Sequence, residues 1–203
     1  FAENPTDTSN RPADLRVTIH DLGPYLEHLF LRAFVDGLHE PGERPTALEW
    51  EKALVRTWDL LQPCANPSCT EKYFILHDQS QPRCPFCGTE IPAQQVLQLK
   101  RLRRLRGKDG QWLPSGLLNL YDGLPLFEWH FKENVFPDEK AENRELAAYI
   151  SFQNGSWYLV NHALTDLRSP AGRLVPPGQA LAIRQHAPFG LAERQNGTLW
   201  SVK

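Results

Sequence analysis

The side chains in this sequence that can do the most specific chemistry are its four cysteines, Cys64, Cys69, Cys84 and Cys87. They form two short-spaced pairs, of the form C-x4-C and C-x2-C, within one short stretch of chain. Two such pairs separated by a hairpin-sized segment are typical of a tetrahedral zinc site, because each pair can cover one side of the ion. Gly88 follows the second pair and lets the backbone turn so that amides can point at the thiolates. The pattern predicts a structural Zn²⁺ site with all four cysteines as ligands.

The same four cysteines have two alternative uses. Two disulfide bonds would require an oxidising compartment. A redox pair at Cys84 and Cys87 would leave the first pair without a role. A zinc ion with four thiolate ligands has no open position for activating water, and the sequence contains no hydrolase elbow, zinc-protease motif or P-loop. We therefore expect no enzymatic activity from this chain.

Composition sets broad limits on the chain. Its 203 residues are 41% hydrophobic and 23% charged, which suits one large or two small domains with a real core. The net charge of -2 predicts no strong general attraction to nucleic acid or membranes. No apolar run is long enough for a membrane span and no secretory-signal pattern is present, so we expect a cytoplasmic location. Because the sequence opens at Phe1 and contains no methionine, we interpret it as a piece of a longer protein.

The first segment, residues 1–62, carries the pattern of two helices. Pro24 suits a first helical position, and apolar residues then recur at spacings of three and four. Thr46, with Glu49 three residues later, forms a capping box that begins a second helix. The apolar positions are Leu26, Leu29, Phe30, Ala33, Phe34 and Leu38, and then Trp50, Leu54, Trp58 and Leu61. The pattern predicts a helical hairpin with one apolar stripe on each helix.

The second segment, residues 63–92, contains the cysteines. Between the two pairs, Tyr73–Leu76 has the composition of a short strand, and turn-forming residues follow it. A segment this short cannot fold on apolar burial alone. We therefore expect a zinc ribbon.

The third segment, residues 93–203, has the pattern of short strands separated by Gly- and Pro-containing turns. Asn154-Gly155 is a hairpin-turn dipeptide between the strand-like runs 148–152 and 157–160. Further strands are expected at 126–130, 173–175, 180–183 and 198–202. Regular short strands of this kind indicate an all-β sandwich, so the whole chain is expected to be α+β.

The helical segment resembles the end of the catalytic lobe of eukaryotic-type serine/threonine protein kinases. The resemblance is carried by Leu29–Phe34 and by Glu40–Trp50, which includes the turn Arg44-Pro45-Thr46. It implies that Arg44 would pair with a glutamate that closes the activation segment in that family. That glutamate, the ATP-binding motifs and the catalytic motifs are absent from this sequence, so phosphoryl transfer is not expected here.

Together with the cysteines, the helical segment resembles one bacterial group of these kinases over Leu22 to Ile91. Its members are associated with tellurite-resistance and stress gene clusters, alongside a von Willebrand A-type protein and a phosphatase. The resemblance implies a non-catalytic regulatory region of such a kinase. It also implies a protein partner, with the von Willebrand A-type protein or the phosphatase as candidates. Its apolar helix surface, no longer covered by a kinase lobe, would pack on the ribbon or bind that partner.

The third segment resembles a divergent forkhead-associated domain, a β-sandwich whose loops read phosphothreonine. The similar stretches are 157–161, 169–173 and 177–181. The phosphate-binding signature is replaced at 129–132, 144–147 and 171–172. We expect the sandwich to bind a protein without reading phosphate. In the alternative, Lys132, Arg144 and Arg173 would supply the charge-assisted donors that phosphate recognition needs.

A basic run at residues 100–108 suggests a second kind of function. It places Lys100, Arg101, Arg103, Arg104, Arg106 and Lys108 beside the cysteine module. Such clusters contact phosphates, so a nucleic-acid-binding zinc-ribbon protein is the alternative function. No aromatic residue interleaves the run for base stacking, and the chain is net acidic. We favour a solvated strand, and consider contact with an acidic partner as a further alternative.

Overall fold

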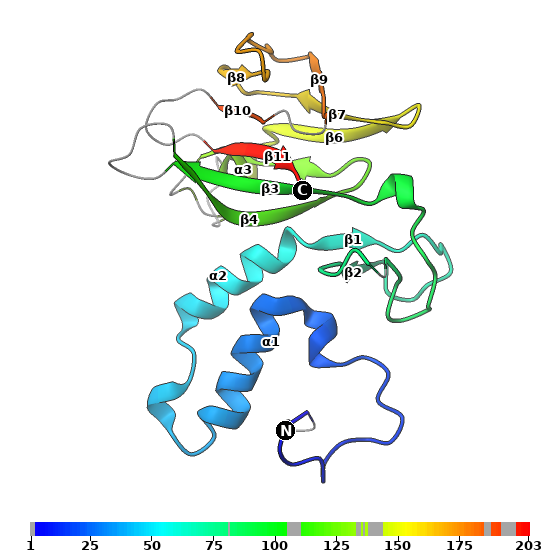
Figure 1. Cartoon of the computed structure of the whole chain (residues 1–203), viewed down its shortest axis with the longest axis vertical. Helices are drawn as coiled ribbons and strands as arrows, with labels where there is room; N and C mark the ends of the chain where they lie inside the picture. Colours follow the sequence, from blue (N-terminus) through cyan, green and yellow to red (C-terminus); the bar gives the residue numbers. More distant parts are fainter. Residues whose placement is uncertain are drawn as a thin grey trace. The chain divides into compact units, whose positions relative to one another are not determined.

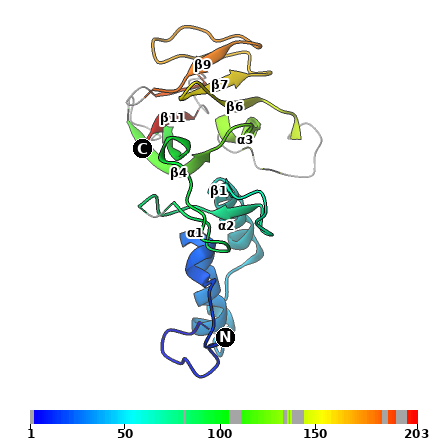
Figure 2. The same ribbon diagram turned by 90° about the vertical axis from the view of Figure 1, so that its right-hand side faces the viewer.

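The computed structural model describes residues 3–80, 82–104, 111–132, 135, 137, 144–184, 188–191 and 198–203. The chain forms two compact units, Phe1–Ala93 and Gln94–Lys203, each considered by itself below (Figure 1 and Figure 2). The first unit contains helices and a two-stranded sheet, and the second contains a five-stranded and a four-stranded antiparallel sheet. The expected α+β composition is confirmed. Within the described residues, no helix is both long and apolar enough to cross a membrane.

The first unit contains the expected helical hairpin. A 3-10 turn at Ile19–Leu22 precedes α1 (Gly23–Leu31), whose first turn contains Pro24 as predicted. A π-helical turn, Arg32–Asp36, continues α1, and a 3-10 turn at Pro41–Glu43 leads to α2 (Ala47–Trp58). The predicted capping box is present, because Thr46 N–H donates to the Glu49 carboxylate at 2.8 Å and Glu49 N–H donates to the Thr46 hydroxyl at 3.3 Å.

The hairpin packs through a small apolar cluster between α1 and α2. Leu26 and Leu29 of α1 are buried against Ala53 of α2, and Phe30 meets Trp50 edge to face at 5.3 Å. Arg32 and Glu49 form an ion pair of 2.5 Å beside this cluster. The Arg32 hydrogen bond is the main cause that lowers the pKa of Glu49 to about 2.

The prediction that Trp50, Leu54, Trp58 and Leu61 form one apolar stripe is wrong in part. Ala53 and Thr57 occupy the buried positions, whereas Leu54 and Trp58 are exposed. A four-residue step overshoots one helical turn by about 40°, so residues 54 and 58 rotate progressively away from the face on which residue 50 lies. Spacings of three and four, as in Trp50, Ala53 and Thr57, keep to one face.

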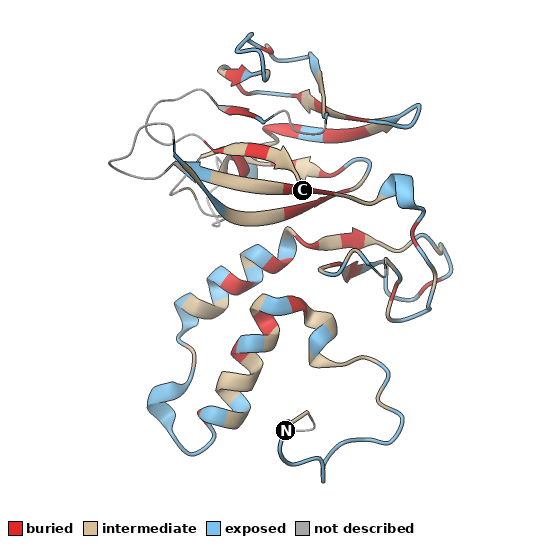
Figure 3. Ribbon diagram, viewed as in Figure 1, coloured by how far each residue is buried: buried red, intermediate tan, exposed pale blue. Residues whose placement is uncertain are grey.

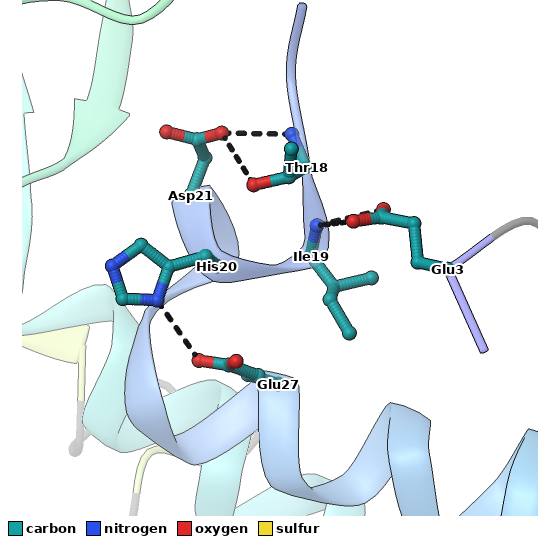
Figure 4. A network of polar contacts seen from close by, with 6 residues as sticks. All are labelled: Glu3, Thr18, Ile19, His20, Asp21 and Glu27. Atoms are coloured by element: carbon teal, nitrogen blue, oxygen red, sulfur yellow. Dashed lines mark hydrogen bonds and ion pairs between the residues drawn. The ribbon is translucent and has the colours of Figure 1, made fainter. Parts of the chain in front are cut away.

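Hydrogen bonds hold the start of the chain onto the first helical turn (Figure 4). The Glu3 carboxylate accepts from Ile19 N–H at 2.8 and 2.9 Å, and the Asp21 carboxylate accepts from Thr18 N–H at 2.7 Å. His20 lies 3.2 Å from the Glu27 carboxylate.

Within the same unit, the start of α1 approaches the cysteine module closely. Gly23 has φ +75°, and a Cβ atom there would lie 2.9 Å from Cγ2 of Ile75. The His20 ring also meets the His77 ring edge to face, with centroids 4.6 Å apart. The hairpin and the cysteine module therefore share a tight contact at which only glycine fits.

Replacing Gly23 by alanine tests this contact. A side chain at this backbone conformation costs on the order of 1–3 kcal/mol, and the short approach to Ile75 adds to that cost. Chemical denaturation should show a lower unfolding midpoint for Gly23→Ala. Gly42→Ala is the matched control, because a Cβ there meets nothing within 4 Å and φ is not positive. Equal midpoints for the two variants would contradict the contact.

The second unit encloses one hydrophobic core between its two sheets. The five-stranded sheet has the order β4-β3-β11-β10-β8 and the four-stranded sheet has the order β5-β6-β7-β9. The strands of the first sheet are β3 (Leu97–Arg104), β4 (Trp112–Leu120), β8 (Leu167–Arg168), β10 (Phe189–Leu191) and β11 (Leu199–Val202). Those of the second are β5 (Pro125–Leu126), β6 (Ala148–Gln153), β7 (Ser156–Asn161) and β9 (Ala180–Ala182). Buried residues recur on both sheets, as the red segments of Figure 3 show, and include Leu99, Leu118, Ile150, Leu159 and Trp200.

The hairpin predicted around Asn154-Gly155 is confirmed. β6 and β7 pair antiparallel from Ala148 opposite Asn161 to Gln153 opposite Ser156. Asn154 and Gly155 have φ angles of 51° and 74°, which is the left-handed backbone that a two-residue turn of this type requires. Two other turn-forming dipeptides of the second unit, Asp109-Gly110 and Asn196-Gly197, lie outside the described residues.

Two expected strands are replaced by other structure. The stretch 126–130 contributes only its first residue to a strand, and α3 (Glu128–Phe131) follows. Phe127 N–H donates to Nδ1 of His130 at 3.0 Å, which closes the helical turn. The carbonyls of His130 and Phe131 then accept from Nε1 of Trp200 and from Thr198 N–H, both at 3.0 Å. The stretch 173–175 forms only an isolated bridge, between Arg168 and Leu174.

Candidate metal centre

A two-stranded ribbon carries the first pair of cysteines. β1 (Leu61–Pro63) leaves α2 after a short turn and pairs antiparallel with β2 (Tyr73–Ile75), which confirms the strand expected between the cysteine pairs. Cys64 N–H donates to the Lys72 carbonyl at 2.8 Å and so extends the pairing by one step. The ribbon thereby sets the position of Cys64 at the end of β1.

The first cysteine loop is closed by hydrogen bonds to its own backbone. Asn66 N–H donates to Sγ of Cys64 at 3.4 Å, and Cys69 N–H donates to the Asn66 carbonyl at 3.0 Å. The Lys72 ammonium group donates to the carbonyls of Pro67 and Cys69 at 2.9 and 3.0 Å. These contacts turn both sulfurs of the loop toward the same side.

The second cysteine loop is a tight turn held by a short antiparallel bridge. Arg83 pairs with Glu90, and Cys84 N–H donates to the Thr89 carbonyl at 2.9 Å. Gly88 has φ +73°, as expected from its place after Cys87, and its N–H donates to the Cys84 carbonyl at 2.8 Å. This conformation places Cys84 and Cys87 on one side of the turn.

The structure brings all four predicted ligands together. The Sγ atoms of Cys64, Cys69, Cys84 and Cys87 all lie within 4.8 Å of one another. The separations across the two loops are 3.5 Å between Cys64 and Cys87 and 3.9 Å between Cys69 and Cys84. Among the described residues this is the group whose donor atoms converge closely enough to hold a metal ion.

The protonation of the cysteines depends on their burial. Burial raises the pKa of the Cys84 thiol to about 12, and burial is also the main cause that raises the pKa of Cys69. At the exposed edge, hydrogen bonding with the Thr89 hydroxyl and backbone lowers the pKa of Cys87 to about 6. The buried thiols therefore resist ionisation unless a cation lies among them, and a divalent metal ion would supply that charge.

One residue of the basic run, Arg101, has a role inside the second unit. Arg101 lies on β3, and its guanidinium donates to the carbonyls of Trp129 and Lys132 at 2.8 and 3.2 Å. Its guanidinium carbon also lies 5.9 Å from the centroid of the Trp200 ring. Arg103, two residues along the strand, is exposed. Residues 105–108 of the run lie outside the described residues.

The candidate phosphate-reading cations Lys132, Arg144 and Arg173 come from three different segments of the second unit. The Lys132 ammonium group pairs with the Glu128 carboxylate at 2.6 Å. Arg173 is exposed, and its backbone N–H donates to the Ser169 hydroxyl at 3.2 Å. Arg144, which precedes β6 by a few residues, is exposed.

The sequence pattern does not identify Arg101 as a structural residue. The partners of Arg101 are backbone carbonyls about thirty positions away along the chain. Every residue has such a carbonyl, so the side chains at those positions do not predict the contact. A bulge between Arg101 and Leu102 in the pairing with β4 is part of the same local arrangement. Only the tertiary structure identifies this contact.

Replacing Arg101 by glutamine should destabilise the second unit. The two carbonyls at the end of α3 would lose a charge-assisted donor, at a cost of about 1–3 kcal/mol. Arg103→Gln, on the same strand and exposed, should change the free energy of unfolding by less than about 0.5 kcal/mol. Urea denaturation of both variants measures the difference, and similar losses from both would argue against the positioning role of Arg101.

No known protein family, curated protein or solved structure matches the chain significantly. The cysteine cluster and the two-sheet unit therefore carry the functional interpretation.

Proposed function

We propose that this chain is a non-catalytic, protein-binding regulatory region of a bacterial serine/threonine kinase, held in shape by a structural zinc ion. The observation that carries the proposal is the convergence of four cysteine sulfurs within 4.8 Å. The kinase assignment comes from the resemblance of the helical hairpin and the cysteine spacing to that group.

The donor set and its geometry suit zinc. Four thiolates are a common ligand set of structural zinc sites, and Zn–S bonds of about 2.3 Å place tetrahedral sulfurs about 3.8 Å apart. The separations of 3.5 and 3.9 Å across the two loops are close to that value. Cys64, Cys69, Cys84 and Cys87 would hold the ion, and its charge would keep all four sulfurs as thiolates.

A four-thiolate site favours a structural role over a catalytic one. Four protein ligands complete the tetrahedron, so no coordination position is left for water or substrate. The ion would instead join the two cysteine loops, which are otherwise connected through short strands and turns. Its contribution to function would be to hold the module that the hairpin packs against through Gly23 and Ile75.

The second unit supports protein binding that does not depend on phosphate. Two antiparallel sheets around one core agree with the sandwich that the forkhead-associated resemblance implies. The pairing of Lys132 with Glu128 satisfies one of the three cations that would have to receive a phosphate. The engagement of Arg101 with backbone carbonyls likewise removes one cation from the alternative nucleic-acid surface.

Metal analysis tests the zinc site. The gently purified chain should contain about one zinc ion per molecule, and Cys84→Ser should lose it together with the ordered cysteine module. Ser68→Ala is the matched control, because Ser68 is exposed in the first loop and is not a ligand. Inductively coupled plasma measurements give the ratio. A ratio far below one in the unmodified chain, or two disulfides in reducing buffer, would contradict the proposal.

Binding experiments test the regulatory role. The chain should co-purify with the von Willebrand A-type protein or the phosphatase encoded beside its kinase. Phosphorylated and unphosphorylated peptides from the kinase should bind equally weakly, because the Lys132 ammonium group is already paired with the Glu128 carboxylate. A clear preference for phosphothreonine would favour the phosphate-reading alternative.

DNA or RNA binding that is lost on raising the salt concentration would favour the nucleic-acid alternative.

A further inference from the structure

Helix α2 has two apolar faces, of which only one is used by the hairpin. On its inner face Ala53 and Thr57 are buried, and Trp50 packs against the cluster with α1. The opposite side of the helix, which we name the outer face of α2, consists of Ala47, Leu48, Glu51, Leu54, Val55 and Trp58. At about 100° per residue these six positions span one continuous side of the helix.

The large apolar side chains of the outer face are open to solvent. Leu48 and Leu54 are each 55% exposed and Trp58 is 64% exposed, and Figure 3 shows exposed segments along α2. Single exposed apolar residues are ordinary on protein surfaces. Three of them along one side of a twelve-residue helix, with a tryptophan among them, are typical of a binding surface.

The helical hairpin that carries the outer face has a net negative charge. Residues 18–60 contain eight Asp and Glu residues but four Lys and Arg residues. Three of those four cations are engaged inside the hairpin. Arg32 pairs with Glu49, Arg44 donates to the Gly37 carbonyl, and Arg56 lies over the Tyr25 ring.

One carboxylate, that of Glu51, lies on the outer face itself. It lies between Leu48 and Leu54, one turn from each, so its carboxylate belongs to the middle of the apolar surface. Lys52, the remaining cation, lies at the edge of the face. A partner that covers the leucines and the tryptophan must therefore bring a positive charge to Glu51, or leave a carboxylate without a partner in a drier environment.

We propose that the outer face of α2 binds an amphipathic helix of a partner protein, with an apolar stripe against Leu48, Leu54 and Trp58 and a Lys or Arg against Glu51. Helix-on-helix contact of this kind needs apolar residues at spacings of three and four on the partner. The inference rests on the proposed partner-binding function and names the surface and the chemistry of the partner. A single short helix offers a small interface, so micromolar affinity is expected, on the order of 1–100 μM.

Designed peptides provide the test. The probe is a helical peptide with leucines at i, i+3, i+4 and i+7 and lysines flanking the stripe, titrated into the full zinc-loaded chain by calorimetry. A second peptide carries glutamates in place of the lysines. The lysine peptide should bind at least about tenfold more tightly, and the difference should shrink as salt is raised.

Substitutions on α2 locate the binding. Trp58→Ala and Leu54→Ser should each weaken the lysine peptide about tenfold or more. Glu51→Gln should weaken it and flatten its salt dependence, whereas Lys52→Gln, the adjacent control, should leave affinity unchanged or slightly increased. Because these side chains are exposed, circular dichroism should show the same helicity and melting for all four variants.

Several results would overturn the inference. Equal affinity for the lysine and glutamate peptides would remove the charge argument, and undiminished binding by Trp58→Ala would remove the surface. Concentration-dependent dimerisation abolished by Leu54→Ser would assign the face to a second copy of the chain. Capture of the von Willebrand A-type protein or the phosphatase equally by the unmodified chain and by Trp58→Ala would place the partner elsewhere, while the proposed regulatory function would still stand.

Discussion

The convergence of four cysteine sulfurs is the constraint on which the first unit of this protein depends. The two strands of the cysteine module are three residues long, and its loops are closed mainly by backbone hydrogen bonds. So little regular structure buries too little apolar surface to offset the loss of chain entropy. A metal ion on the sulfurs would replace that missing stabilisation, and without one the buried thiols of Cys69 and Cys84 favour the neutral form.

The same module supports the helical hairpin. α2 runs into β1 after two residues, and Gly23 at the start of α1 lies against Ile75 of β2. The hairpin therefore meets the cysteine module both along the chain and across space. This arrangement leaves one face of α2 packed on α1 and the other exposed, which explains how a short helix can be stable and still present apolar side chains to solvent.

The second unit depends on a different kind of contact. The short helix α3 ends with carbonyl groups that accept from Arg101, from the indole of Trp200 and from the backbone of Thr198. Arg101 lies on β3, Trp200 lies on β11 and Thr198 directly precedes β11, so residues of the sheet and its border satisfy the end of the helix. A run of basic residues that resembles a nucleic-acid surface in the sequence thus contains a cation used for internal structure.

Features that depend on near neighbours were determined by the sequence alone. The capping box of Thr46 and Glu49, the Asn154-Gly155 turn and the short spacing within each pair of cysteines each act within a few residues, so their patterns predict their structure. Features that depend on distant residues were decided only by the tertiary structure. Trp200 and Thr198 satisfy the carbonyls at the end of the helix formed by residues 128–131, and Trp58 is exposed because Ala53 and Thr57 occupy the buried side of α2 instead. The local sequence limits the conformations that a segment can adopt. Which side of the segment is buried depends on residues that are distant in the sequence and that only the tertiary fold brings into contact with it.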